Sequence, residues 1–421
     1  MIMKPKINLN SFFEKERLFK YVNDFSFPRL AGTEGEQKAL DLVVKTFNNI
    51  GFKDSQIETQ KFDFSTFYSE ILVKIIAFMS ISIISLLLLI KYLYPFFTII
   101  TIFIMVIIFL SIVNVLKHPE YQEFWEKHFG KIISSSNIFL KINAQNNSFE
   151  KAGNIIVSAH LDSKSQTFKT IWRVIFFLIW EFGIITLVIL YTFFLMDLYF
   201  KVIPRVIYLM ELGIIFVSIL IIFSNIMILF INTRNQSPGA LDNASGMAII
   251  FELSSFFKDH KLNNFNLWFC QFSAEEIGTM GSRFFLDSFD SLFSKENTFQ
   301  INFDMISGDN KNESRVEYIK SYGIMPPKRI SGTLETSINN AAREENVYVK
   351  GFNVLSGAHT DSVPFHLRKY DSVDFATFDA SKYSHSPQDT PDKVNPTTLF
   401  NACKLVARMI INLDSKFESV G

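Results

Sequence analysis

The chain has 421 residues, enough for two or three domains of ordinary size. Its 41 basic and 41 acidic residues give a formal net charge of zero. The chain therefore lacks the basic surface that nucleic-acid binding needs, and we expect no nucleic-acid partner. Only 19% of the residues are charged and 47 are phenylalanine, a composition that a water-soluble surface would not tolerate throughout. Part of the chain is expected to lie in a lipid bilayer.

The two cysteines, Cys270 and Cys403, lie far apart in sequence and form no CxxC motif. This spacing rules out a disulfide framework and a cysteine-based zinc site. We expect two buried thiols in a reducing compartment.

The first segment, residues 1–70, begins the soluble part of the chain. It mixes polar and apolar residues and has no apolar core of a signal peptide. A loop rich in Pro and Gly is expected at 28–34, a helix at 37–50 and a strand at 57–64.

Residues 71–116 are expected to form a first membrane hairpin. They carry only two charges, Lys74 and Lys91, and residues 92–116 carry none. At about 1.5 Å per helical residue, this uncharged run exceeds the roughly 30 Å hydrocarbon core of a bilayer. We predict two helices here, at about 71–91 and 95–116.

Residues 117–170 return to the soluble part. Strands are expected at 138–142 and 154–159. Between the hairpin and the first of these strands, residues 118–129 place aromatic side chains among charges, a pattern typical of a helix at the membrane interface.

Residues 171–232 are expected to form a second hairpin, with helices at 174–196 and 206–231. Each helix carries one acid, Glu181 or Glu211. Acids inside a membrane are candidates for function, including transport. With only two acids and no basic partner in the spans, we favour interhelical contact or self-association, so a homo-oligomer is one expected partner. The alternative for all four helices is burial in an exceptionally large soluble core.

Each insert holds an even number of spans, so residues 1–70, 117–170 and 233–421 must emerge on one face of the membrane. Together they are about 310 residues, the size of one large domain. More Lys and Arg residues flank the hairpins on this side than at their tips, which predicts that the domain is cytoplasmic. Four N-glycosylation sequons argue for the other face, but this short pattern arises easily by chance.

The last segment, residues 233–421, continues with helices at 246–257 and 282–293 and strands at 265–272 and 299–303. Strands alternating with helices predict an α/β fold with a mostly parallel central sheet flanked by helices. In such sheets functional groups gather at the carboxyl ends of the strands.

Five polar motifs follow or interrupt the apolar segments. Taken alone, each has an ordinary explanation: a structural histidine, a helix N-cap or a solvated loop. In chain order they are His160-Leu-Asp162, Gly239-Ala-Leu-Asp242-Asn243, Glu275-Glu276, Asn302-Phe-Asp304-Met305 and Tyr383-Ser-His385-Ser-Pro-Gln-Asp389.

In their order these motifs resemble the di-zinc aminopeptidase family of metallopeptidase clan MH. Its relatives include glutamate carboxypeptidase, glutaminyl cyclase and the non-enzymatic transferrin receptor and nicastrin. The resemblance extends over essentially all of the soluble part, including the Arg29-x-Ala-Gly-Thr loop and Asp361-Ser-x-Pro-Phe365. It implies the zinc-exopeptidase fold, which is phosphorylase/hydrolase-like. The two hairpins depart from the family pattern but remove none of its motifs.

The resemblance implies a metal site with five ligands. His160 and Asp304 would hold one Zn²⁺, Glu276 and His385 would hold the other, and Asp242 would bridge the two. Nitrogen and oxygen donors with a shared carboxylate suit paired zinc, and Co²⁺ or Mn²⁺ could substitute.

The resemblance also implies catalytic roles for Glu275 and Asp162. Glu275 would be the general base that moves a proton from water to the leaving amine, while the paired ions lower the pKa of that water. Asp162 would orient the His160 ring. The peptide bond between Asp242 and Asn243 is implied to be cis. The resemblance assigns no residue to substrate binding.

Together with the hairpins, the resemblance implies a membrane-anchored metallopeptidase, most simply an aminopeptidase that releases N-terminal residues from peptides. A catalytically silent receptor or scaffold of the same fold is the alternative from another class, although such relatives lack ligands and this chain has all five. Cyclase or carboxypeptidase action stays open, since motifs for metals do not define substrate specificity.

Overall fold

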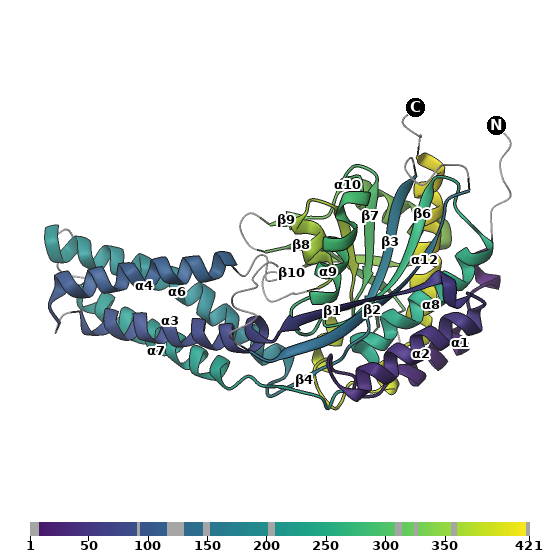
Figure 1. Cartoon of the computed structure of the whole chain (residues 1–421). Helices are drawn as coiled ribbons and strands as arrows, with labels where there is room; N and C mark the ends of the chain where they lie inside the picture. The colour runs from purple at the N-terminus through teal and green to yellow at the C-terminus, as the bar shows by residue number, and fades with distance from the viewer. Residues whose placement is uncertain are drawn as a thin grey trace. The chain divides into compact units, whose positions relative to one another are not determined.

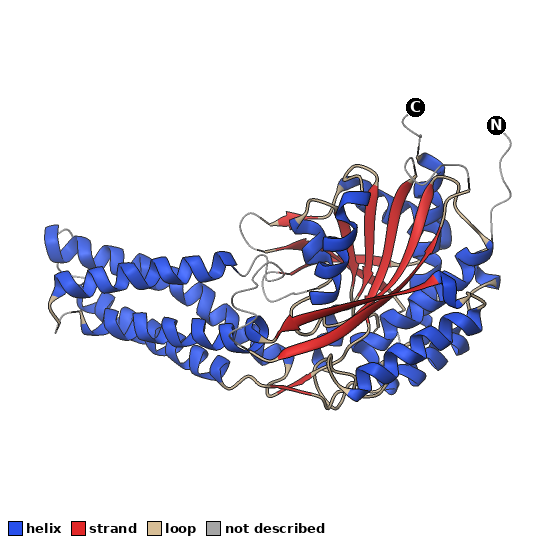
Figure 2. Cartoon of the chain, viewed as in Figure 1, coloured by secondary structure: helices blue, strands red, loops and turns tan. Residues whose placement is uncertain are grey.

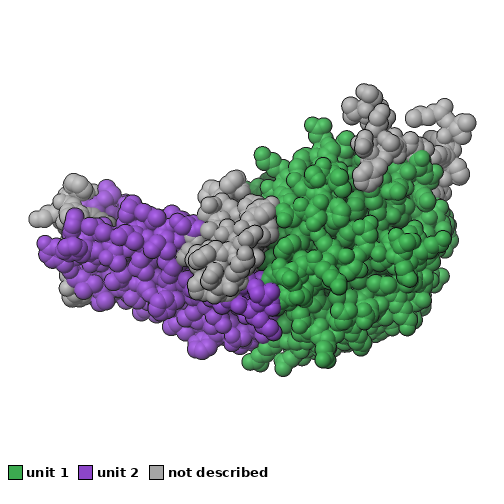
Figure 3. All heavy atoms as spheres, viewed as in Figure 1, with its two compact units in different colours: residues 1–64, 133–166, 234–421 green, residues 65–132, 167–233 purple. Residues whose placement is uncertain are grey.

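The computed structural model describes residues 8–90, 93–115, 130–145, 152–200, 207–307, 314–323, 327–354 and 360–417. The chain divides into two compact units (Figure 3). The first unit comprises residues 1–64, 133–166 and 234–421, and the second comprises 65–132 and 167–233. The second unit thus collects the two segments that the sequence predicted as membrane hairpins.

The first unit is built on a nine-stranded sheet with helices on both faces (Figure 2). The strand order is β1-β2-β6-β3-β7-β11-β8-β10, and β9 pairs with β8. The strands are β1 (Ile57–Ser65), β2 (Ile132–Ile142), β3 (Gly153–His160), β6 (Phe265–Phe272), β7 (Thr298–Phe303), β8 (Val316–Tyr322), β9 (Lys328–Arg329), β10 (Val349–Val354) and β11 (Asp371–Phe375). β4 (Ser165–Gln166) and β5 (Thr233–Arg234) form a separate two-stranded sheet.

The sheet is mixed, and the predicted parallel arrangement holds at its centre. β3 runs parallel to both β6 and β7, and β11 runs parallel to β7. Towards the edges, β2 is antiparallel to β6, and β8 is antiparallel to β11. Every described residue of β3, β6 and β7 is buried, which explains why these strands read as continuous apolar runs. Strand direction at the edges leaves no such mark in the sequence.

Helices cover the sheet in two groups (Figure 1). The larger core packs α1 (Lys15–Phe25), α2 (Glu34–Ile50), α8 (Ser245–Asp259), α10 (Gly332–Glu345) and α12 (Pro396–Lys416) against the strands. A second cluster packs α9 (Met280–Phe289) and α11 (Ser362–Leu367) against side chains such as Phe139 and Trp268. The two cysteines are free and buried, as predicted.

The predicted helix boundaries agree with the structure to within a few residues. α2 starts three residues before the predicted position and ends at Ile50, and the next residue, Gly51, has a φ of +103° that suits a residue without a side chain. α9 ends at Phe289 and continues as the 3₁₀ turn Asp290–Leu292. The interfacial helix predicted at 118–129 lies outside the described residues.

The second unit consists of α3 (Leu72–Leu89), α4 (Pro95–Val115), α6 (Thr170–Phe200) and α7 (Ile207–Leu229). A short π-helical turn, Phe67–Ile71, leads into α3. Among the described residues, three stretches are long and apolar enough to cross a membrane: Phe67–Leu89, Thr170–Phe194 and Ile207–Leu229. The apolar stretch of α4, Phe96–Ser111, is shorter, so the structure supports three of the four predicted spans.

The helices of the second unit pack through apolar side chains. Leu187, Tyr191 and Phe194 of α6 contact Ile214 and Ile221 of α7 in one buried cluster. Many other large apolar side chains of these helices are exposed, among them Phe97, Phe103, Val188, Phe216 and Ile219. Helices that are apolar all round are typical of membrane spans.

Candidate metal centre

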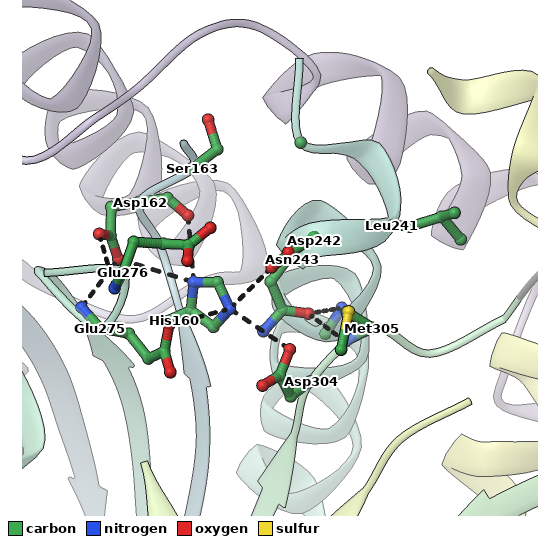
Figure 4. Close-up of polar contacts among 12 residues, drawn as sticks. His160, Asp162, Ser163, Leu241, Asp242, Asn243, Glu275, Glu276, Asp304 and Met305 are labelled. Carbon is green, nitrogen blue, oxygen red and sulfur yellow. Dashed lines mark hydrogen bonds and ion pairs between the residues drawn. The ribbon is translucent and has the colours of Figure 1, made fainter. Parts of the chain in front are cut away.

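The first predicted ligand ends the central strand. His160 is the last residue of β3 and is almost completely buried between β6 and β7. Its Nδ1 lies 3.0 Å from the main-chain oxygen of Asp162, and its Nε2 points the other way, into the site (Figure 4). The hydrogen bond at Nδ1 fixes the ring and leaves Nε2 available as a ligand atom.

Asp242 lies in the tight segment Ala240–Ala244, just before α8. The peptide bond between Asp242 and Asn243 is cis, as the family resemblance implied. The Asn243 side chain donates to the main-chain oxygen of Phe303 at 2.7 Å, which ties this segment to the end of β7. The amides of Leu241 and Asp242 donate to the two carboxylate oxygens of Asp389, at 2.6 and 3.1 Å.

Two further strand ends bring the remaining acids to the site. Asp304 follows β7, and Glu275 and Glu276 follow β6. Ala274 and Met305, next to these acids, have φ values of +56° and +55°. Residues with side chains seldom adopt this left-handed conformation, and such residues cluster at functional sites.

Asp162 accepts two main-chain hydrogen bonds across the sheet. Its Oδ1 and Oδ2 accept the amides of Glu275 and Glu276, at 3.1 and 3.2 Å (Figure 4). Its Oδ1 is 3.6 Å from His160 Nδ1, farther than its own main-chain oxygen. The Asp162 carboxylate therefore holds the two glutamates, and the contact to the His160 ring comes mainly from the main-chain oxygen.

The fifth predicted ligand comes from a loop near the C-terminus. His385, also with a positive φ of +57°, lies in the loop before the 3₁₀ turn Pro391–Lys393. Its Nε2 is 3.1 Å from Asp242 Oδ2 and 3.0 Å from Glu276 Oε2. Five segments that are far apart in sequence thus meet at one place.

The ligand atoms form two groups that share Asp242. His160, Asp242 and Asp304 form the first group, and Asp242, Glu276 and His385 form the second. His160 Nε2 is 3.2 Å from Asp242 Oδ1 and 3.4 Å from Asp304 Oδ1. Because Asp242 directs Oδ1 to one group and Oδ2 to the other, it could bridge two cations.

Within the described part of the chain, three buried atoms at this place contact other predicted ligands but have no hydrogen-bond partner: His160 Nε2, Asp242 Oδ2 and Asp304 Oδ1. Leaving such atoms unsatisfied costs about 1–3 kcal/mol each, and more when the group is charged. A cation in the first group would satisfy His160 Nε2 and Asp304 Oδ1, and a cation in the second group would satisfy Asp242 Oδ2. The residues present therefore fit a metal, and their imidazole and carboxylate donors suit zinc.

The surroundings lower the pKa of Glu276 and Asp242 and raise the pKa of Glu275. Burial and Asp242 would raise the pKa of Glu276, but His385 and Lys164 more than offset this and hold it at about 2. The two histidines likewise lower the pKa of Asp242, against the effect of burial. Burial raises the pKa of Glu275 well above its usual value, and the charges of Glu276 and Asp304 add to this effect.

Two basic residues at the site were not assigned a role from the sequence. Arg29, in the first loop, is fully buried and donates to the main-chain oxygens of Leu161, Pro238 and Gly239 at 2.6 to 2.8 Å. It thereby joins the chain around His160 to the turn before Asp242. Lys164 contacts Glu276. Asp389 stands in the motif that begins at Tyr383, but its hydrogen bonds to two amides depend on the tertiary fold.

Comparison with known proteins agrees with this geometry. Residues 229–410 match peptidase family M28. Aminopeptidase YwaD of Bacillus subtilis (strain 168) is 26% identical over 179 residues, which are 41% of this chain. The chain spans only 37% of that relative's length.

Solved structures of similar fold cover nearly the whole chain. BSAP, a zinc aminopeptidase from Bacillus subtilis, superposes with a TM-score of 0.55 at 13% identity and covers 97% of both chains. A glutaminyl cyclase from an Acidobacteriales bacterium gives a TM-score of 0.54 at 14% identity and covers 99% of both chains. The family resemblance predicted from the motifs is thereby confirmed, with residues 229–410 carrying the match to peptidase family M28.

Proposed function

We propose that this protein is a membrane-anchored, two-zinc exopeptidase, and specifically an aminopeptidase that releases N-terminal residues from peptides. The observation that carries the proposal is the pair of ligand groups sharing Asp242, with Glu275 beside them. Glu275 belongs to neither ligand group. Its Oε2 lies 4.0 Å from His160 Nε2.

His160, Asp242 and Asp304 would hold one zinc ion, and Asp242, Glu276 and His385 would hold the other. Bound zinc would polarise the peptide carbonyl and lower the pKa of a water molecule at the site. Co²⁺ or Mn²⁺ would suit the same donors.

Glu275 is the proposed general base. Its carboxylate would take a proton from water and deliver it to the nitrogen of the leaving group. Burial raises its pKa, which brings a carboxyl group closer to the neutral range in which proton transfer in both directions is efficient. The hydrogen bond from its amide to Asp162 holds the base in place during the transfer.

Two features favour peptide hydrolysis by an aminopeptidase. The sequence relative is an aminopeptidase, and all five predicted ligands and the base are present, which argues against a silent receptor. Glutaminyl cyclase action is the second candidate, because a cyclase shares the fold over the whole chain.

We also propose that α3 with α4, and α6 with α7, are two membrane hairpins inserted into the peptidase domain. The three long apolar helices support membrane association. The distribution of Lys and Arg around the hairpins favours a cytoplasmic peptidase domain. Contacts among the hairpins of neighbouring copies could support a homo-oligomer.

The test is hydrolysis of matched peptides with free and N-acetylated amino termini, together with an N-terminal glutaminyl peptide, by the full chain in detergent. We expect cleavage of free-amine peptides only. Glu275→Gln should lower kcat by roughly 10²- to 10⁴-fold and keep its metal. Loss of ammonia from the glutaminyl peptide without hydrolysis would favour the cyclase, and the absence of both reactions with two ions bound would favour the receptor.

A further inference from the structure

Lys164 contacts one of the predicted metal ligands through both its side chain and its main chain. Its Nζ lies 2.9 Å from Glu276 Oε2 and donates to the Glu276 main-chain oxygen at 2.7 Å. Its amide donates to Glu276 Oε1 at 3.3 Å. The lysine side chain is only 12% exposed, so water screens this ion pair poorly.

These contacts use the atoms that a metal would need. Glu276 Oε2, which accepts the lysine ammonium, is also 3.0 Å from His385 Nε2. The ammonium and a cation held by Glu276 and His385 would therefore share one carboxylate oxygen. They would also repel each other at close range in a buried site.

The other ligand group has no such neighbour. Among the described residues, no lysine or arginine lies within ion-pair distance of Asp242 or Asp304. Asp304 Oδ1 and His160 Nε2 lie 3.4 Å apart, and within the described chain neither has a hydrogen-bond partner outside the ligand group. The second group thus has a direct ion pair with a lysine, and the first group has none among the described residues.

We infer that Lys164 makes the Glu276–His385 position the weaker of the two metal sites, so that the ions bind in a fixed order and the second is readily lost. This inference rests on the proposed two-metal function and adds a regulatory consequence. Activity would follow the free metal concentration around the second dissociation constant, while the first site stays filled.

The test is a zinc titration of metal-free full-length protein in detergent, followed with a competing chromophoric chelator. The titration reads metal affinity directly and does not depend on turnover. The variants are Lys164→Met, which keeps the chain length but removes the charge, and Lys164→Arg, which keeps the charge. Lys258→Met is the matched control, because Lys258 is a partly buried lysine that donates to a main-chain oxygen, that of Ile50, at 2.7 Å.

For the wild type we expect two binding steps that differ in affinity. Lys164→Met should tighten the second step by about tenfold or more and leave the first within about threefold, since a nearby charge acts strongly on a divalent ion. Lys164→Arg and Lys258→Met should keep the wild-type separation. Circular dichroism and thermal unfolding of the metal-free proteins check that each variant folds.

Three outcomes would overturn the inference. An unchanged second step in Lys164→Met would mean that the lysine charge does not matter, and a weaker one would mean that Lys164 positions Glu276 for the metal. Two equal steps in the wild type would remove the proposed order and leave the two-metal function standing. A wild type that binds no zinc, or one ion only, would instead contradict the proposed function itself.

Discussion

The carboxylate of Asp162 accepts the main-chain amide of Glu275 at 3.1 Å, although the two residues follow different strands, β3 and β6. Its other oxygen accepts the amide of Glu276. One buried carboxylate therefore fixes the proposed base and a proposed ligand in the same turn, directly beside His160. The position of Glu275 depends on a residue that has no direct part in the proton transfer.

Asp162→Asn should disturb this arrangement without changing its size. Asparagine keeps one acceptor oxygen, but its amide group faces the other main-chain amide, which loses its partner. We expect metal affinity and kcat/KM to fall by about 10- to 100-fold. Zinc content after dialysis and peptide hydrolysis measure the two effects. Asp41→Asn, at an exposed helix position, is the control. Wild-type behaviour of Asp162→Asn would show that the two hydrogen bonds are dispensable.

Metal removal should destabilise the first unit. Without cations, His160 Nε2, Asp242 Oδ2 and Asp304 Oδ1 stay buried and unsatisfied. A ligand that binds only the folded state stabilises it by about 2.7 kcal/mol at one hundred times its dissociation constant. We expect a chelator to lower the Tm by several degrees and added zinc to restore it.

His385→Ala provides the matched comparison for metal removal. It keeps the first ligand group and removes part of the second, so zinc should still raise the Tm, but by less than in the wild type. A Tm that does not respond to chelation in either protein would count against a structural contribution from metal.

The sequence predicted the centre of this fold better than its edges. β3, β6 and β7 are buried on both faces, so their apolar runs marked them plainly, and each ends in a polar motif. The direction of β8 depends on its tertiary partner β11, which no local pattern records.

The candidate site was likewise predictable in part. The five proposed ligands and the proposed base Glu275 stand in recognisable motifs. The contacts of Lys164, Arg29 and Asp389 join segments more than 100 residues apart, and the motifs around Arg29 and Asp389 do not indicate which atoms these side chains bind. Only the folded chain brings them to the metal centre.

Asp361 should make stability fall as pH rises from about 4 to about 7. It is fully buried, its Oδ1 accepts the Ser282 hydroxyl at 2.6 Å, and its Oδ2 has no hydrogen-bond partner. Burial raises its pKa to about 7, above the value of about 3.9 for an unfolded chain. Between these values the folded state holds a proton that the unfolded state has lost, so the favourable contribution is lost as pH approaches 7.

Asp361→Asn tests this pH dependence. Asparagine keeps the acceptor for Ser282 and cannot ionise, so the variant should gain stability relative to the wild type as pH rises from 5 to 8. We expect a relative gain on the order of 1–3 kcal/mol, measured by denaturant unfolding at each pH with zinc held constant. Asp287→Asn, at an exposed ion pair with Arg368, is the control. Parallel pH profiles for the wild type and Asp361→Asn would rule out the predicted titration.

Two glycines of the second unit give a matched pair of predictions about helix packing. A Cβ added to Gly183 of α6 would lie 2.6 Å from Cγ1 of Ile221 on α7, closer than real contacts allow. At Gly213 of α7 the nearest atom, Cδ1 of Leu190, is 3.5 Å away, an ordinary contact. Gly183→Ala should therefore force α6 and α7 apart at a cost of about 1–3 kcal/mol. Gly213→Ala should be neutral or slightly stabilising, because alanine is the better helix former.

The readout for this pair is thermal unfolding of the full chain in detergent, with metal content measured in parallel. Since both substitutions add one methyl group to the same helix pair, their difference isolates the contact with Ile221 from any general effect of alanine. Gly183→Ala with Ile221→Val should recover part of the loss, because valine lacks the terminal methyl group and presents a smaller side chain at this contact. Equal melting temperatures for the two single variants would mean that α6 and α7 do not pack as closely at Gly183 as the structure places them.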